Sequence, residues 1–201
     1  ENLYAVGNSG EKIIAYALPY SGEVTTPAAA KYAFQLPEAE VVKVVGTVKR
    51  AVQLDKAAIV LTHEADGTAH IYKVVDGVAV AELSQEGVVA RDAENAGDLL
   101  AISDIALTED GKLVAINKIV CQAGDAQVDE GYKRGETRVY IWNDLAGAPS
   151  VWFTSKMSSN WYRSVQGHTM AYKGTSINGT LFTTGVTATG TKFRYSVYNV
   201  I

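Results

Sequence analysis

Residues 102–117, ISDIALTEDGKLVAIN, form the pattern that most restricts what this chain can fold into. Apolar and polar residues alternate on both sides of Asp110-Gly111, which is the period of an extended strand. Asp-Gly between two such runs favours a two-residue hairpin turn, because glycine adopts positive φ without a Cβ clash. The glycine and the β-branched side chains disfavour a helix here. The pattern therefore predicts antiparallel strands at 102–108 and 112–118.

Similar tight turns recur along the chain in two sets. The first set lies between apolar runs at 55–56, 110–111 and 178–179. The second set lies near 9–10, 66–67 and 187–190, and a long loop centred near residue 128 takes the remaining place. The second set recurs about every 60 residues, a spacing that suits four short strands per repeat.

The strands that follow the second set of turns share an aromatic residue in their middle or second half. They read KIIAYAL, AHIYKVV, TRVYIW and KFRYSVY. Fourth strands are predicted at 78–83 and 151–154, and at either 31–36 or 41–45. We expect Val139 or Ile141, and Ile105 or Leu107, to be buried between sheets.

The predicted fold is all-β, a β-propeller-like array of four-stranded antiparallel meanders in one domain. Its repeat units are expected at about 1–45, 46–101, 102–166 and 167–201, which gives two complete units between two incomplete ones. A closed propeller needs about four to eight blades, so the array is expected to be an incomplete ring. A β-sandwich is the alternative, because it has the same strand signals.

Composition excludes some classes of partner. The formal net charge is −4 and the pI is about 5.4, so nucleic-acid binding, which needs a basic face, is not expected. No run of about 18 apolar residues occurs, so no transmembrane segment is expected. Cys121 is the only cysteine, which excludes an intramolecular disulfide. The chain begins at Glu1, which suggests a processed N-terminus.

The order of an Asp-containing strand, an Asp-Gly turn, an apolar strand and an aromatic-containing strand resembles the divergent propellers of bacterial exported proteins. The Gly-, Thr- and Tyr-rich style is also similar to surface or periplasmic proteins of carbohydrate-scavenging gut bacteria. The resemblance covers the whole chain, but only in repeat style, and no WD dipeptide or kelch double glycine is present. It implies an exported protein at the periplasm, cell surface or outside, and it assigns no functional residue.

Two long connections, 120–136 and 155–167, are expected on one face of the array, where binding surfaces usually form. The second connection leads to the candidate ligand-binding residues, which are Trp161, Tyr162, Arg163 and His168. Aromatic side chains beside a planar cation suit the flat faces of sugars or of an aromatic ligand. The alternative is that Trp161 and Tyr162 wedge between neighbouring blades.

Metal and catalytic sites have weaker support. The acidic residues between 125 and 136 do not have EF-hand spacing, and a solvated loop is the simpler interpretation. His63 and His70 flank a hairpin turn and form at most a weak metal site. Asp104 is more simply a residue that binds backbone amides, and 178–180 matches a glycosylation sequon but also turn chemistry. No cofactor, metal site or catalytic residue is predicted.

Two functions remain open. The favoured one is a non-enzymatic binding or scaffold module that recognises a glycan or a partner protein. The alternative is a propeller-type hydrolase or lyase with an unrecognised acidic site. An enzyme needs titratable groups within hydrogen-bond reach in one concave site, whereas a binding module needs an exposed aromatic platform.

Overall fold

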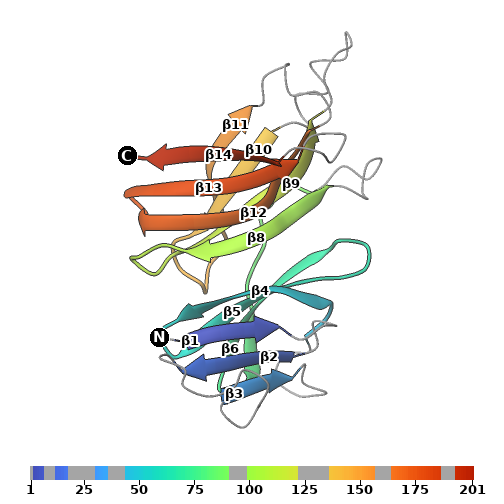
Figure 1. The fold of residues 1–201 in the computed structure, drawn as a ribbon, viewed down its shortest axis with the longest axis vertical. Helices are drawn as coiled ribbons and strands as arrows, with labels where there is room; N and C mark the ends of the chain where they lie inside the picture. Colours follow the sequence, from blue (N-terminus) through green and yellow to red (C-terminus); the bar gives the residue numbers. More distant parts are fainter. Residues whose placement is uncertain are drawn as a thin grey trace. The chain divides into compact units, whose positions relative to one another are not determined.

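Antiparallel strands and no helix make up the part of the chain that the computed structural model describes (Figure 1). The backbone is described for 2–6, 12–17, 30–35, 44–90, 99–121, 136–156, 164–186 and 193–201. Side chains are described for 44–90, 99–119, 136–155, 167–185 and 195–201. The predicted all-β class is confirmed for these residues, and they contain no helix that could cross a membrane.

The chain divides into two units. The first comprises 1–65 and 69–83, and the second comprises 66–68 and 84–201. Each unit contains its own antiparallel sheets.

The first unit holds a three-stranded and a four-stranded sheet. The three strands, in spatial order, are β1 (Asn2–Val6), β2 (Lys12–Ala17) and β3 (Ala30–Gln35). The four strands are β4 (Thr47–Leu54), β5 (Ala57–His63), β6 (Ala69–Val75) and β7 (Val78–Glu82). The predicted strands at 31–36 and 78–83 correspond to β3 and β7, which confirms both.

Tyr72, the central aromatic of β6, is fully buried and holds the segment that leads into β4. Its hydroxyl accepts a hydrogen bond from the Val45 amide at 3.2 Å. The Thr62 hydroxyl donates to the Val45 carbonyl at 2.6 Å. Both polar groups of one backbone unit are therefore satisfied by side chains from inside the sheet.

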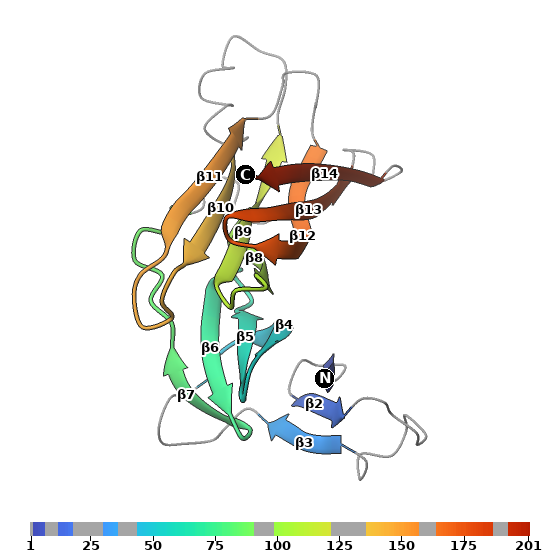
Figure 2. The same ribbon diagram turned by 90° about the vertical axis from the view of Figure 1, so that its left-hand side faces the viewer.

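The second unit is a seven-stranded arrangement of two meanders. One consists of β8 (Leu100–Leu107), β9 (Leu113–Cys121), β10 (Glu136–Trp142) and β11 (Ser150–Lys156). The other consists of β12 (Ser164–Thr175), β13 (Asn178–Val186) and β14 (Phe193–Val200). They are joined where residues 119–121 of β9 pair with 164–166 of β12. Figure 2 shows β12, β13 and β14 crossing the direction of β9, β10 and β11.

The core of the second unit lies between these two meanders. Its buried members are Ala106, Val114, Ile116, Val139, Ile141, Met170 and Leu181. Aromatic rings complete it, with Trp152 against Tyr172 at 5.6 Å and Phe153 against Tyr198 at 5.3 Å between ring centroids. The predicted burial of Val139 and Ile141 is confirmed.

The central hairpin is present, but its turn differs from the predicted one. β8 and β9 pair antiparallel up to Leu107 opposite Leu113, and Ile105 is buried as expected. The Thr108 amide donates to the Lys112 carbonyl, and the Gly111 amide donates to the Thr108 carbonyl. Only Gly111 in this loop has positive φ, at 79°. The turn is therefore a three-residue loop with a glycine bulge, and the two-residue prediction is wrong.

The turn predicted at Asn178-Gly179 is also displaced. Thr175 pairs with Asn178, so the two loop residues are Ser176 and Ile177, and Asn178 already begins β13. We attribute this displacement of the turn to Asp110, which lies 66 residues away in the sequence. Its carboxylate accepts hydrogen bonds from the Ser176 amide at 2.7 Å and from the Ser176 hydroxyl at 2.6 Å. This contact fixes the turn at Ser176.

Candidate functional site

The residues that the sequence singled out for binding fall mostly outside the described part of the chain. Trp161, Tyr162 and Arg163 lie within 157–163, which the structure does not describe. His168 is described, and it lies exposed on β12 at a register shift between Gln166 and Thr169.

The strand ends on either side of the two long connections come together at one end of the second unit. Cys121, the last residue of β9, pairs with Ser164, the first residue of β12. Glu136, the first residue of β10, pairs with Lys156, the last residue of β11. The connections 122–135 and 157–163 therefore both leave and rejoin the sheets at this end.

The described residues contain a different exposed aromatic surface, on β12, β13 and β14. Strand alternation sends Leu181 and Thr183 inward, where they are buried, and Phe182 and Thr184 outward. The register places Phe182 beside Val197 and Thr184 beside Tyr195. We call the outward side chains of these three strands the outer face; they are Thr169, Ala171, Lys173, Thr180, Phe182, Thr184, Tyr195, Val197 and Asn199.

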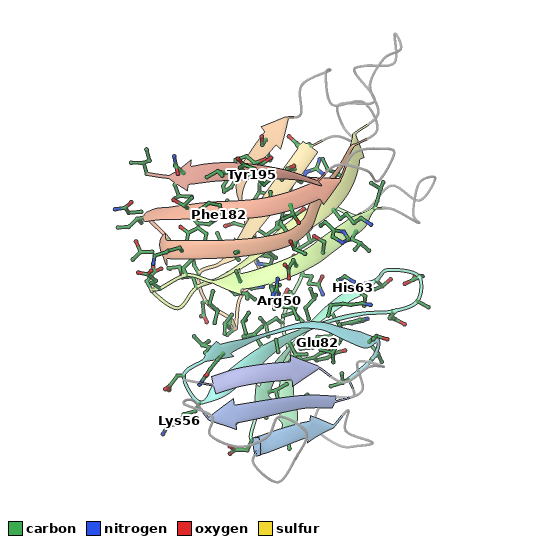
Figure 3. All side chains as sticks on the ribbon, in the orientation of Figure 1. Arg50, Lys56, His63, Glu82, Phe182 and Tyr195 are labelled. Carbon is green, nitrogen blue, oxygen red and sulfur yellow. The ribbon has the colours of Figure 1, made fainter. Side chains whose placement is uncertain are left out.

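Large apolar side chains on the outer face are open to solvent. Tyr195 is 76% exposed, Phe182 46% and Val197 45%. Figure 3 labels Phe182 and Tyr195 on neighbouring strands. A contiguous exposed apolar patch of this kind usually marks an interaction site.

Polar groups border the apolar side chains of the outer face. The hydroxyls of Thr169 and Thr184 lie 2.6 Å apart in a cross-strand hydrogen bond beside Tyr195. The Thr180 hydroxyl donates to the Asn199 side-chain carbonyl at 3.3 Å on the other side of Phe182. The face thus presents two rings and a valine between rows of hydroxyl and amide groups.

Buried contacts hold β12 in place beneath this face. Asp104 on β8 is buried, and its carboxylate accepts hydrogen bonds from the Met170 amide at 2.6 Å and the Ile105 amide at 3.0 Å. The Ser103 hydroxyl bonds to the carbonyls of Ile116 and Gly167. Asp104 therefore binds backbone amides, as the sequence predicted, and it holds β12 from the side opposite the outer face.

Hydrogen bonds also join the β8–β9 turn to the β12–β13 turn. The Glu109 amide donates to the Gly174 carbonyl at 2.8 Å, and Asp110 binds Ser176. Hydrogen bonds from Ser176 and then Thr108 lower the pKa of Asp110 to about 2. Asp110 therefore remains a charged acceptor of these hydrogen bonds well below neutral pH.

The two histidines of the β5–β6 hairpin do not share a site. His63 pairs with Ala69, and His70 pairs with Thr62, so the two side chains point to opposite faces of the sheet. Within the described residues no group of three His, Cys, Asp or Glu side chains could hold a metal ion.

His70 instead joins two carboxylates. Its Nε2 lies 2.9 Å from Glu64 and its Nδ1 lies 2.6 Å from Glu82, while its ring stacks on Tyr72. Carboxylates only accept hydrogen bonds, so both bonds form together when both ring nitrogens carry protons. Partial burial acts to lower the pKa of His70, but the bonds and charges of Glu64 and Glu82 outweigh it, and the pKa is raised.

We expect the stability of the first unit to depend on the protonation of His70. A raised folded-state pKa means that this stabilisation is complete below the unfolded value of about 6.5 and is lost as the pH rises through the folded value. Melting temperatures of the protein and of His70→Gln, compared from about pH 5 to about pH 9, should differ most at the acidic end. A difference that grows toward alkaline pH would contradict this.

The outer face was not among the binding surfaces predicted from the sequence. Tyr195 and Phe182 were present in predicted strands, and the alternation in 180–184 and 193–199 separates two sets of side chains. Both sets contain aromatic residues, because Tyr198 packs inward while Tyr195 is exposed. The alternation therefore indicated two faces without telling which one is covered.

Comparison with known proteins assigns no family to this arrangement. No protein-family model matches the chain, and no curated protein sequence matches it significantly.

Proposed function

We propose that this chain is a non-enzymatic binding module that recognises a glycan on the outer face of β12–β14. The observation that supports this proposal is the exposed pair Tyr195 and Phe182, set among hydroxyl and amide groups on a sheet whose other side is a packed core. Such a face is the platform expected of a binding module.

The chemistry of the face suits a sugar. A sugar ring has a flat C–H surface, which stacks on an aromatic ring, and a rim of hydroxyls that need hydrogen-bond partners. Tyr195 offers the ring, and Thr184 and Asn199 lie on the same face as neutral polar partners. Tyrosine has few rotatable bonds, so little conformational entropy is lost when it is covered.

The long connections belong to the same proposal. Trp161, Tyr162 and Arg163 lie in the sequence between β11 and β12, and the start of β12 pairs with the end of β13, at Val165 opposite Val186. We include Trp161, Tyr162 and Arg163, together with His168 on β12, in the proposed recognition surface. The proposal includes an exported location and a propeller-like ring, and a partner protein is the alternative ligand.

A hydrolase or lyase is the second class considered, and the described residues favour it less. Asp104, its leading acid, is buried and bonded to backbone amides, so its carboxylate is not presented to a substrate. His70 and its two carboxylates belong to the first unit, whereas the exposed rings belong to the second.

A glycan array probed with the labelled protein, together with a pull-down from cell extract, tests the proposal. Retention on a defined class of glycan is the expected result. Retention of no glycan, with a protein captured in the pull-down, would replace the glycan with a protein ligand.

Replacing Tyr195 by alanine should weaken binding of the retained glycan by about fivefold or more, which is about 1 kcal/mol, with the melting temperature nearly unchanged. The side chain is mostly exposed, so its loss removes little packing. Ile177→Ala is the control, because Ile177 is 79% exposed on the β12–β13 turn and lies off the outer face. Equal affinity of the two variants would contradict the assignment of Tyr195.

A further inference from the structure

The strand β14 forms one end of the strand order in the second unit, and among the described strands it pairs only with β13. It pairs with β13 over eight consecutive residues, 193–200, without a register shift. The part of the chain that the structure describes thus contains a long, regular sheet edge.

Other edges of the two larger sheets are interrupted. The pairs that include the edge strands β4, β7, β8 and β11 each contain a register shift. Bulges and charged residues are devices by which proteins prevent unwanted pairing at sheet edges. β14 has no register shift, and residues 195–200 carry no charged side chain.

The hydrogen bonds of β12 show which residues of β14 direct their backbone amides and carbonyls away from β13. Gly174 exchanges hydrogen bonds with Glu109, so its backbone groups point away from β13. Backbone groups alternate sides along a strand, so Thr175, Lys173 and Ala171 point toward β13. Their partners on β13 are Asn178, Thr180 and Phe182.

The residues between these on β13 turn their backbone groups toward β14. Leu181 and Thr183 thus bond to Tyr198 and Ser196. The alternate residues of β14, which are Tyr195, Val197 and Asn199, direct their amides and carbonyls to the open edge. Their side chains are the β14 part of the outer face.

We propose that this edge pairs with β14 of a second copy of the chain, antiparallel about a two-fold axis at Val197. In that register Val197 faces its own counterpart and Tyr195 faces Asn199 of the other copy, so open-edge backbone groups meet open-edge backbone groups. Residues 195–199 are uncharged, so the strand meets no like charge in its inverted copy. The paired sheets make one six-stranded sheet with both outer faces on the same side.

This pairing goes beyond the proposed glycan binding and does not depend on it. It would place two outer faces side by side, with Phe182 and Val197 of each copy in one continuous row. A module with two adjacent sites binds a repeating ligand more tightly than either site alone, because the second contact is intramolecular.

Sedimentation velocity of the whole chain, over a concentration series reaching the submillimolar range, tests the pairing. A species of twice the 21.5 kDa chain mass is expected at the upper concentrations. Val197→Lys places two ammonium groups opposite each other and should raise the dimer dissociation constant about tenfold or more. Thr184→Lys is the matched control, because it adds the same charge to the same face on the interior strand β13.

Two outcomes would overturn the proposal. One is a monomer at every concentration for the wild-type protein. The other is a dimer that survives Val197→Lys but is lost in Phe182→Ala, because that would show the outer faces stacking on each other. Melting temperatures of all variants distinguish lost pairing from lost folding.

Hydrogen exchange gives an independent measure of the pairing geometry. The amides of Tyr195, Val197 and Asn199 should exchange more slowly as the concentration of protein rises. The amides of Ser196 and Tyr198 should be protected at every concentration, because they bond to β13. Concentration-dependent protection of all five amides alike, or of none, would contradict pairing at this edge.

Discussion

Replacing Ile141 by alanine is expected to lower the free energy of unfolding by about 2–5 kcal/mol. Ile141 is only 4% exposed on β10, and it belongs to the core that also contains Met170 and Leu181 from the crossing strands. Alanine would leave a cavity between the two meanders, because the strands on both sides are fixed by their ladders. Urea or guanidinium unfolding curves of the two proteins measure the difference.

Val151→Ala provides the matched control on the neighbouring strand β11. Val151 is 44% exposed, so its truncation should change the free energy of unfolding by no more than about 0.5 kcal/mol. A loss below about 0.5 kcal/mol for Ile141→Ala as well would mean that the two meanders do not pack through this residue.

Gly167→Ala should destabilise the second unit by at least about 3 kcal/mol. Gly167 has a φ of 71°, which is costly for any other residue, and an added Cβ would overlap the carbonyl oxygen of Asn117 on β9. Asn117 has little freedom to move, because its side chain bonds to the Glu136 carbonyl at 3.0 Å and to the Arg138 amide at 2.8 Å. Thermal and denaturant unfolding both report the loss.

Gly147→Ala is the control for this substitution. A Cβ at Gly147 would meet only the Asp144 carbonyl oxygen, at an ordinary contact distance of 3.6 Å. Its effect on the free energy of unfolding should stay within about 0.5 kcal/mol. Equal stability of Gly167→Ala and Gly147→Ala would show that β9 and β12 do not approach each other as described.

The strands of the second unit were predictable because their pattern is local. Alternation and β-branched residues in 102–118 require an extended chain, and the Asp-Gly pair requires a reversal near residue 110. The turn type was not predictable in the same way. The turn type depends on the hydrogen bond between the Thr108 amide and the Lys112 carbonyl, which closes the loop. A loop of two residues and a loop of three residues are both compatible with the alternation of apolar and polar residues in the two strands.

The turn near residue 178 shows how a tertiary contact overrides local preference. Asn-Gly is a strong turn signal by itself. In the folded chain, Asp110 from another hairpin binds Ser176, and the turn forms two residues earlier. Gly179 then serves a different purpose, because a Cβ there would overlap the hydroxyl of Tyr172, which donates to the Thr175 carbonyl.

The aromatic residues in the middle of the strands were visible in the sequence, but their partners were not. Tyr72 and Tyr140 are both buried, and each hydroxyl accepts a hydrogen bond from a backbone amide outside its own sheet ladder, at Val45 and Val89 respectively. Those amides lie 27 and 51 residues away. Burial raises the pKa of both phenols, which therefore stay protonated at neutral pH.

The sheet β12–β14 has aromatic residues on both sides; those on one side pack against the core and those on the other are exposed. Inward, Tyr172 and Tyr198 pack against β11, and Asp104 and Ser103 hold β12 through its backbone. Outward, Phe182 and Tyr195 have solvent on one side. A rigid sheet with one packed side and one exposed aromatic side is suited to binding, because the exposed groups are held in place before the ligand arrives.

Backbone and side-chain chemical shifts of the isotope-labelled protein, followed while the glycan retained on the array is added, test most directly whether the outer face is the recognition surface. The expected result is that the largest changes occur at Phe182, Thr184, Tyr195 and Val197, with small changes at the inward residues Leu181 and Tyr198. Changes that leave Phe182 and Tyr195 unaffected, while residues around His70 respond, would contradict the assignment of this face.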